Sequence, residues 1–232
     1  MVIIQNLFTC GLVILFFSVF TTIPCFSQGG ESMTVRSGEK IIELSEPVLK
    51  GGVSFEEALA ARRSVRDFTG ERLTEKELSQ LLWSAQGTTR SWGGRTAPSA
   101  GALYPIELYI VLPEGLFRYV SMGHKLVRIS DQNLFKPLAG AALGQECIRH
   151  APAVIVITAV YERTERKYGR RGERYVKMEV GHTAENILIQ AISLGLGAVP
   201  IGAFYDDRVS RALNLPENHE PLYLIPVGRE RK

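Results

Sequence analysis

The chain has 232 residues, 45% of them hydrophobic, which is enough for one sizeable core and too little for two domains of ordinary size. Its 27 basic and 24 acidic residues give a net charge of only +3, which argues against binding to nucleic acid through overall charge. The four histidines and three cysteines lack the spacing of metal ligands, so we expect no metal site.

The first 27 residues differ in composition from the rest of the chain. Residues 7–26 carry no charged side chain, and small side chains up to Ser27 match the positions that a signal peptidase reads. We therefore expect a signal peptide and an exported domain, periplasmic or extracellular. An uncleaved anchor that attaches the domain to the membrane through its N-terminus is the alternative, because the apolar run approaches the roughly 20 residues of a spanning helix.

Residues 28–53 are rich in Gly, Ser, Glu and Lys and show little periodicity, which predicts a linker or an extended arm. The folded domain is expected over residues 54–232. It opens at Ser54, which has with Glu57 the spacing of a capping box at the start of a helix. The side chains expected to face the core from this helix are Phe55, Ala58 and Leu59.

The first helix leads into residues 62–68, where three arginines surround a serine. Like charges so close together repel one another unless an anion binds, and guanidinium groups present paired donors that match phosphate oxygens. A solvated helix end that complements the helix dipole is the alternative. The polar members of this cluster are Arg62, Arg63, Ser64 and Arg66.

Thr74 and Glu77 repeat the capping box and predict a second helix, which ends at Gly87. Residues 88–105 follow as a segment of Thr, Ser, Gly and Pro that is longer than a passive connection needs. We expect a functional loop there, and a disordered surface excursion is the alternative. The second helix is expected to bury Leu78, Leu81, Leu82 and Ala85.

The middle of the chain predicts a sheet built around one fully buried strand. Residues 107–112 have the pattern of a strand, and residues 116–129 predict a hairpin. Residues 132–150 predict a helix with a break at Pro137. Residues 153–160 form an apolar run rich in Val and Ile, which indicates the central strand, buried on both faces.

Residues 162–174 hold six basic and three acidic side chains. Because the acidic side chains interleave, we expect a solvated loop rather than a nucleic-acid-binding face. Residues 175–194 predict a long helix in which Gly181 indicates close packing against another helix. The remaining elements are expected over residues 198–201 (strand), 207–213 (helix) and 222–227 (strand). Without a strict βαβ alternation, the expected fold class is α+β, a mixed sheet surrounded by helices.

Five stretches of the chain together match one known family. They are residues 62–68, 97–105, 181–186, 195–202 and 226–229. In order and spacing they resemble the nitroreductase-like FMN-dependent oxidoreductases, most closely the SagB-type dehydrogenase branch, over nearly the whole chain from residue 54 onward. The resemblance implies a nitroreductase-like α+β fold with FMN bound at the interface of a homodimer.

The resemblance also implies roles for the basic cluster. Arg62 and Arg66 match family positions near the N1 and C2 carbonyl edge of the flavin, where a cation stabilises the charge that grows on reduction. Arg63, Ser64 and Arg229 match positions that hold the phosphate, and the division of roles among the three N-terminal arginines stays open. Gly228 precedes Arg229 in the same motif.

Two segments without charge match family positions along the flavin ring, where small residues let the backbone approach. Residues 98–102 correspond to a loop that reaches the flavin from the second subunit. Residues 201–203 correspond to a turn whose backbone amide faces N5, the atom that accepts hydride. These residues are Pro98, Ser99, Ala100, Gly101, Ala102, Ile201, Gly202 and Ala203.

Lys167 and Tyr168 form the only Lys-Tyr dipeptide of the chain, and such a pair transfers protons in azoline-oxidising members of the SagB-type branch. A solvent-facing pair is the alternative. The expected activity is hydride transfer between a small organic or modified-peptide substrate and FMN, with dioxygen or a quinone as acceptor, since exported proteins lack NAD(P)H. An NAD(P)H-dependent nitroreductase and a non-catalytic flavin- or ligand-binding protein are the alternatives.

Overall fold

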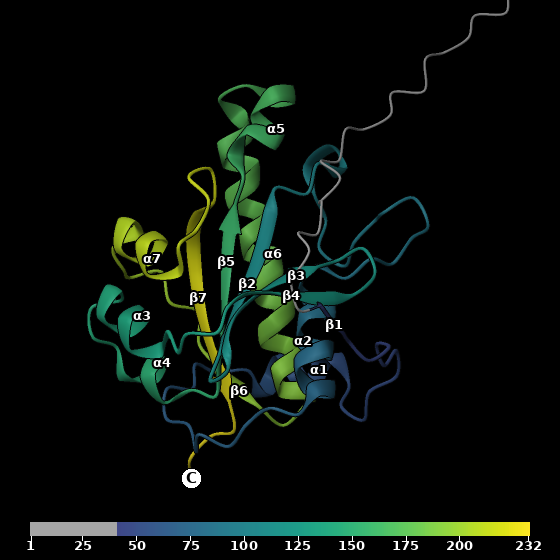
Figure 1. The fold of residues 1–232 in the computed structure, drawn as a ribbon. Coiled ribbons are helices and arrows are strands. Elements are labelled where there is room, and N and C mark those ends of the chain that lie inside the picture. Colours follow the sequence, from purple (N-terminus) through teal and green to yellow (C-terminus); the bar gives the residue numbers. More distant parts are fainter. Residues whose placement is uncertain (1–40) are drawn as a thin grey trace, which may run out of the picture. The chain divides into compact units, whose positions relative to one another are not determined.

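The computed structural model describes residues 41–232 (Figure 1). The predicted signal peptide or anchor, and residues 28–40 of the predicted linker, lie outside this part of the chain. Within residues 41–232, no helix is long and apolar enough to cross a membrane.

The described residues form one seven-stranded sheet in the order β1-β4-β3-β2-β5-β7-β6, and every pair of neighbouring strands is antiparallel. The predicted central strand is confirmed, because β5 lies between β2 and β7 and all its residues are buried. The strands are β1 (Ile41–Glu43), β2 (Ile106–Leu112), β3 (Gly115–Val120), β4 (Lys125–Ser130), β5 (Ala153–Ala159), β6 (Gly197–Ala198) and β7 (Glu220–Gly228).

Helices cover both faces of the sheet (Figure 1), so the predicted α+β class is confirmed. Alternate side chains of β5 face opposite sides. Ile155 and Ile157 join the core that includes α2 and α6, whereas Val154 and Val156 join the core that includes α3, α4 and α7. The helices are α1 (Phe55–Ala61), α2 (Glu75–Gln86), α3 (Phe135–Ala141), α4 (Glu146–His150), α5 (Tyr161–Tyr168), α6 (Arg171–Ser193) and α7 (Asp206–Leu213), with the 3₁₀ turn η1 (Ala100–Ala102).

Both predicted capping boxes are present. The Glu57 carboxylate accepts from the Ser54 amide at 2.8 Å, and Ser54 Oγ accepts from the Glu57 amide at 3.2 Å. The predicted apolar stripe of α1 is wrong, however, because Phe55 is 63% exposed and Leu59 46% exposed, and only Ala58 is buried. This helix has seven residues and packs on α6, and its larger apolar side chains stay largely exposed within residues 41–232.

The start of the described chain belongs to the sheet. Ile41–Glu43 pair with β4 at its edge, and the Val48 amide donates to Gln80 Oε1 at 2.8 Å. Residues 41–48, which fall within the predicted linker, are therefore attached to β4 and α2 of their own chain.

The helical break predicted at Pro137 lies elsewhere. Pro137 is the third residue of α3, where a backbone amide has no partner inside the helix, so proline costs nothing there. The break falls between α3 and α4, where Leu143 and Gly144 have φ of 58° and 74°. These left-handed conformations end α3.

The predicted solvated loop over residues 162–174 is helical instead. It forms α5 and the first turn of α6, separated by Gly169 at a φ of 56°. The interleaved charges that suggested a loop are also typical of a solvated helix face, and Glu173 pairs with Lys177 one turn later. The close packing predicted at Gly181 is absent, since an added Cβ would meet no atom of residues 41–232 within 4 Å apart from its own turns of α6.

Candidate active site

The basic cluster lies beside the C-terminal end of β7. The Val65 amide donates to the Ala198 carbonyl at 3.1 Å, and the Thr69 amide donates to the Arg229 carbonyl at 2.9 Å. Residues 62–68 therefore run along β6 and the end of β7, near the C-terminus marked in Figure 1. Segments more than 120 residues apart in the sequence meet here, as the resemblance implied.

Glycines make this approach feasible. A Cβ on Gly197 would lie 2.6 Å from the Cβ of Val65, and a Cβ on Gly228 would lie 2.5 Å from Cδ of Pro152. Contacts this short do not occur between real atoms, so a larger residue at position 197 would push Val65 and the basic cluster away from β6, and one at position 228 would collide with Pro152. The glycines of the 195–202 and 226–229 stretches thus position the arginines.

The arginines of the cluster differ in their partners. Arg63 pairs with Glu230, and Arg229 Nη2 lies 2.8 Å from Glu77 Oε1. Within residues 41–232, Arg62 and Arg66 form no ion pair, and the buried Nη1 of Arg229 has no hydrogen-bond partner. Unpaired guanidinium groups and an orphaned buried donor fit an anionic group such as the phosphate of FMN.

The turn predicted to face flavin N5 pairs with the same strand, β7. Ile201 exchanges two backbone hydrogen bonds with Leu224 of β7, at 2.8 and 3.0 Å. Leu224 precedes Gly228 by four residues, which corresponds to about 13 Å along a strand. Gly202 and Ala203 follow on the exposed side, and the Gly202 amide donates no hydrogen bond within the described chain. The residues expected at the phosphate and those expected at the flavin ring thus lie along one strand.

The loop that contains residues 98–102 meets α5. Gly101 has a left-handed φ of 64°, and a Cβ added to it would lie 2.8 Å from the Tyr168 hydroxyl and 2.9 Å from Lys167 Nζ. Two features that the sequence singled out separately, 66 residues apart, therefore lie in contact. Glycine is needed at position 101 for both its backbone conformation and this approach.

Within one chain the two groups of residues lie apart. The basic cluster is beside Val227, which pairs with Ala153 at the start of β5. The Lys167 group follows the other end of β5, where the Val160 amide donates to the Pro105 carbonyl at 2.8 Å. The length of β5 corresponds to roughly 20 Å, and Figure 1 shows β6 and α5 at opposite ends of the sheet.

The structure contains a polar cluster that the sequence analysis did not predict, formed by Arg95 with Gln86 of α2 and Thr183 of α6. Arg95 Nη1 donates to Gln86 Oε1 at 3.1 Å, and Gln86 Nε2 donates to Thr183 Oγ1 at 2.7 Å. Glu179 of α6 is only 2% exposed, and burial raises the pKa of its carboxyl to about 7. The sequence held one signal for this burial. Glu179 follows the buried Val176 by three residues and so falls on the apolar face of the predicted helix.

We expect Glu179→Gln to stabilise the protein above about pH 7. The folded state holds this proton to a higher pH than the unfolded chain, so stability falls as pH rises from about 4.5 to about 7 and is constant beyond, by at most about 3 kcal/mol. The amide side chain of the Glu179→Gln variant does not ionise, so the variant avoids this loss of stability. Thermal unfolding across this pH range measures the effect, with the exposed Glu185→Gln of the same helix as control; identical pH profiles for wild type and Glu179→Gln would contradict it.

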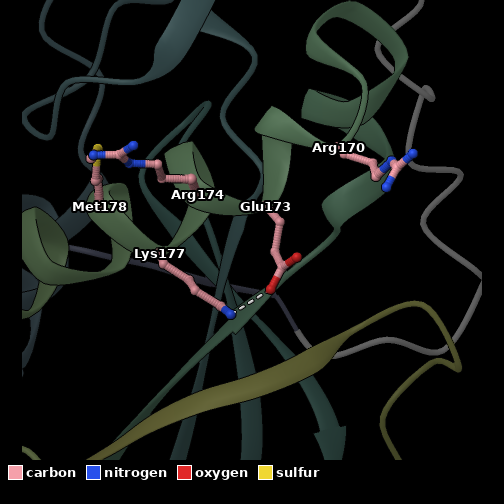
Figure 2. Close-up of a pocket in the computed structure, with 5 residues that line it drawn as sticks. All are labelled: Arg170, Glu173, Arg174, Lys177 and Met178. Atoms are coloured by element: carbon pink, nitrogen blue, oxygen red, sulfur yellow. Dashed lines mark hydrogen bonds and ion pairs between the residues drawn. The ribbon is translucent and has the colours of Figure 1, made fainter.

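A hollow of about 460 Å³ lies over the first half of α6, away from the basic cluster. It is lined by Arg170, Glu173, Arg174, Lys177 and Met178. In Figure 2, Lys177 pairs with Glu173, while Arg170 and Arg174 point away from each other. Its cationic groups do not converge, so this hollow lacks the geometry of an anion site.

Comparisons with known proteins agree with this arrangement. The nitroreductase family model matches residues 59–229. One relative is MJ1384 of Methanocaldococcus jannaschii, which is named as a nitroreductase. It is 47% identical over 184 residues, which cover 77% of this chain and 92% of the relative. A crystal structure from Ralstonia eutropha, also described as a nitroreductase, has a TM-score of 0.76 at 33% identity and covers 84% of this chain and 91% of its own.

The chain therefore belongs to the nitroreductase family. The predictions of an oxidoreductase and of FMN as its cofactor are confirmed at the level of this family, whose more distant members include FMN reductases. A further relative, the microcin B17-processing protein McbC of Escherichia coli, is 27% identical over 136 residues, which cover 53% of this chain and 49% of McbC.

Proposed function

We propose that this protein is an FMN-dependent dehydrogenase or oxidase of the SagB type, which removes hydride from a small organic or modified-peptide substrate. The observation that supports this proposal is the approach of Lys167 Nζ and the Tyr168 hydroxyl to the same glycine of the 98–102 loop. The name of McbC, a peptide-processing protein, supports a peptide-derived substrate such as one that carries an azoline ring.

The chain would contribute binding and proton transfer. FMN, when bound, supplies the hydride acceptor N5. Arg62, Arg63, Ser64, Arg66, Gly228 and Arg229 would hold its phosphate and its N1 edge, and Ile201, Gly202 and Ala203 would lie beside the ring. Oxidation of the saturated ring C–C bond of an azoline to a double bond releases a hydride from one carbon and a proton from the other, and the Lys167–Tyr168 pair would take the proton and pass it to solvent. Dioxygen or a quinone would then accept the two electrons.

We also propose that the site forms between two copies of the chain. The basic cluster and the Lys167 group stand roughly 20 Å apart along β5, too far for both to contact one flavin ring. In a homodimer the second copy can supply Pro98, Ser99, Ala100, Gly101 and Ala102 together with Lys167 and Tyr168. The exposed Phe55 and Leu59 of α1, with Val48 and Leu49 before it, offer apolar surface for such an interface.

An NAD(P)H-dependent nitroreductase is the second candidate, favoured by the nitroreductase name of MJ1384 and the FMN reductases among the relatives. Export, which we propose from residues 1–27, disfavours it because NAD(P)H is scarce outside the cytoplasm. A non-catalytic flavin-binding protein would leave Lys167 and Tyr168 without a role.

Anaerobic flavin reduction separates these functions. We expect organic donors such as azoline-containing peptides to bleach the flavin absorbance of the wild type, and Tyr168→Phe to slow bleaching by about 100-fold. Rapid bleaching by NADPH, coupled to turnover of a nitroaromatic and without reaction with organic donors, would establish the nitroreductase instead. A colourless protein that takes up no added FMN would contradict both enzymes.

A further inference from the structure

Tyr175, in the second turn of α6, contacts the tyrosine of the proposed proton-transfer pair. The centroids of the Tyr168 and Tyr175 rings lie 5.1 Å apart, and the ring planes meet at 84°. Aromatic pairs favour this edge-to-face geometry, because the positive edge of one ring meets the negative face of the other. The two tyrosines therefore pack as a specific pair, and no role proposed above uses Tyr175.

The tight turn between α5 and α6 brings the two rings together. The Gly169 amide ends α5 by donating to the Glu165 carbonyl at 2.7 Å. A Cβ on Gly172 would lie 2.9 Å from the backbone of Glu165, so a larger residue would force α6 away from α5. Tyr175 follows Gly172 by three residues and therefore lies on the same face of α6. Where α5 folds against the start of α6 (Figure 1), this face presents Tyr175 to α5.

Arg171 holds the hydroxyl end of Tyr175. Arg171 Nε donates to the Tyr175 hydroxyl at 2.9 Å, and its guanidinium carbon lies 5.7 Å from the centroid of that ring. On the other tyrosine, Lys167 Nζ lies 5.5 Å from the centroid of Tyr168. Cations within about 6 Å of a ring centroid are attracted by the ring. A continuous series of contacts thus runs from Arg171 through both tyrosines to the loop at Gly101.

Packing decides where the Tyr168 hydroxyl lies. Within residues 41–232 this hydroxyl forms no hydrogen bond, and the side chain is half-buried. The hydroxyl of a tyrosine moves with the χ1 torsion, which has three staggered positions. A change of χ1 would carry the Tyr168 hydroxyl away from Gly101 and would also break the ring contact with Tyr175. The ring contact therefore stabilises the rotamer that faces the loop.

We propose that Tyr175 is a positioning residue for the proposed proton transfer. Its ring holds Tyr168 in the rotamer that places the hydroxyl beside Gly101. Arg171 in turn holds the hydroxyl of Tyr175. The proton passes from the substrate to the Lys167–Tyr168 pair, and Tyr175 itself transfers none. The part of Tyr175 in catalysis rests on the proposed function, whereas its hold on the Tyr168 ring does not.

A double-mutant cycle in the full-length chain loaded with FMN tests this role. The readout is the rate of anaerobic flavin reduction by a saturating peptide that carries one thiazoline ring. Tyr175→Leu suits a helix but removes the ring, and it should slow reduction about tenfold. Tyr175→Phe keeps the ring and should stay within about threefold of the wild type. In the Tyr168→Phe background, Tyr175→Leu should change the rate by less than about twofold, because the hydroxyl that it positions is gone.

Equal slowing by Tyr175→Leu with and without the Tyr168 hydroxyl would overturn the proposal, since a general structural role acts in both backgrounds. The absence of slowing in the wild-type background would overturn it as well. Arg171→Ala should slow reduction about threefold, because the Tyr175 hydroxyl loses its donor. Arg170→Ala removes the neighbouring exposed arginine and should leave the rate unchanged. Equal rates in these two variants would overturn the part given to Arg171.

Fluorine NMR separates a failure of the positioning role from a failure of the proposed function. In the FMN-loaded chain labelled with 3-fluorotyrosine, the Tyr168 resonance is identified by its loss in Tyr168→Phe. Tyr175→Leu removes a ring current and should shift this resonance by more than its linewidth, whereas Tyr175→Phe should not. An unmoved resonance in Tyr175→Leu would overturn the positioning role. If the resonance moves while Tyr168→Phe reduces flavin as fast as the wild type, the proposed function fails and Tyr175 still positions Tyr168.

Discussion

Replacing Gly101 by alanine is expected to remove most of the turnover while leaving the fold intact. The added Cβ would lie within 2.9 Å of both Lys167 Nζ and the Tyr168 hydroxyl, so these groups must move, and alanine is strained at a φ of 64°. Displacement of reacting groups by about 1 Å can lower a rate about 100-fold. We expect kcat to fall by about this factor, and steady-state kinetics with an organic donor measures it.

Gly181→Ala is the matched control for this substitution. It adds the same methyl group to α6 at a position where nothing lies within 4 Å, and alanine suits a helix better than glycine. Its turnover should equal that of the wild type. Normal turnover in Gly101→Ala would show that the contact between this loop and α5 has no part in the reaction.

Arg66→Ala is expected to weaken FMN binding strongly without destabilising the fold. Arg66 is exposed and forms no ion pair within residues 41–232, so its removal leaves no buried charge behind. Loss of a charge-assisted hydrogen bond to the flavin should reduce affinity about 10- to 100-fold. If Arg66 lies at the N1 edge, the reduction potential of bound FMN should also decrease, because the reduced ring loses its cation.

Two further variants serve as controls for Arg66→Ala. Fluorescence titration with FMN measures the affinity of all three variants and of the wild type. Arg66→Lys keeps the charge but loses the paired donors, so its affinity should lie between those of the wild type and the alanine variant. Arg170→Ala removes an equally exposed arginine from the hollow of Figure 2 and should bind FMN normally. Equal losses in Arg66→Ala and Arg170→Ala would point to nonspecific attraction.

The parts of the fold that depend on local chemistry could be predicted from the sequence. The capping boxes at Ser54 and Thr74 and the two-sided burial of β5 follow from short-range patterns, and each is present. The convergence of Arg63, Ser64 and Arg229 on one end of β7 could be anticipated only through the family resemblance, because pairing between distant segments leaves no local signal.

The errors arose where tertiary contacts decide the outcome. The basic residues of α5 were expected in a loop, because interleaved charges occur equally on loops and on solvated helices. Phe55 and Leu59 were expected in the core, although a seven-residue helix at the edge buries only Ala58. The contact between Gly101 and Lys167 also escaped the sequence, since it depends on how the loop folds back onto α5.

Complementation between two impaired variants, assayed at an FMN concentration that saturates the wild type but not Arg66→Ala, tests the central proposal, a flavin site shared by two copies, most directly. Arg66→Ala and Gly101→Ala chains would be co-expressed with different tags, and their mixed assemblies would be purified together with the parent assemblies. If one copy supplies the basic cluster and the other supplies the loop, each mixed dimer keeps one intact site, and random pairing restores about a quarter of the wild-type activity. Activity that stays at the mean of the two variants would place the whole site within one chain and contradict the proposal.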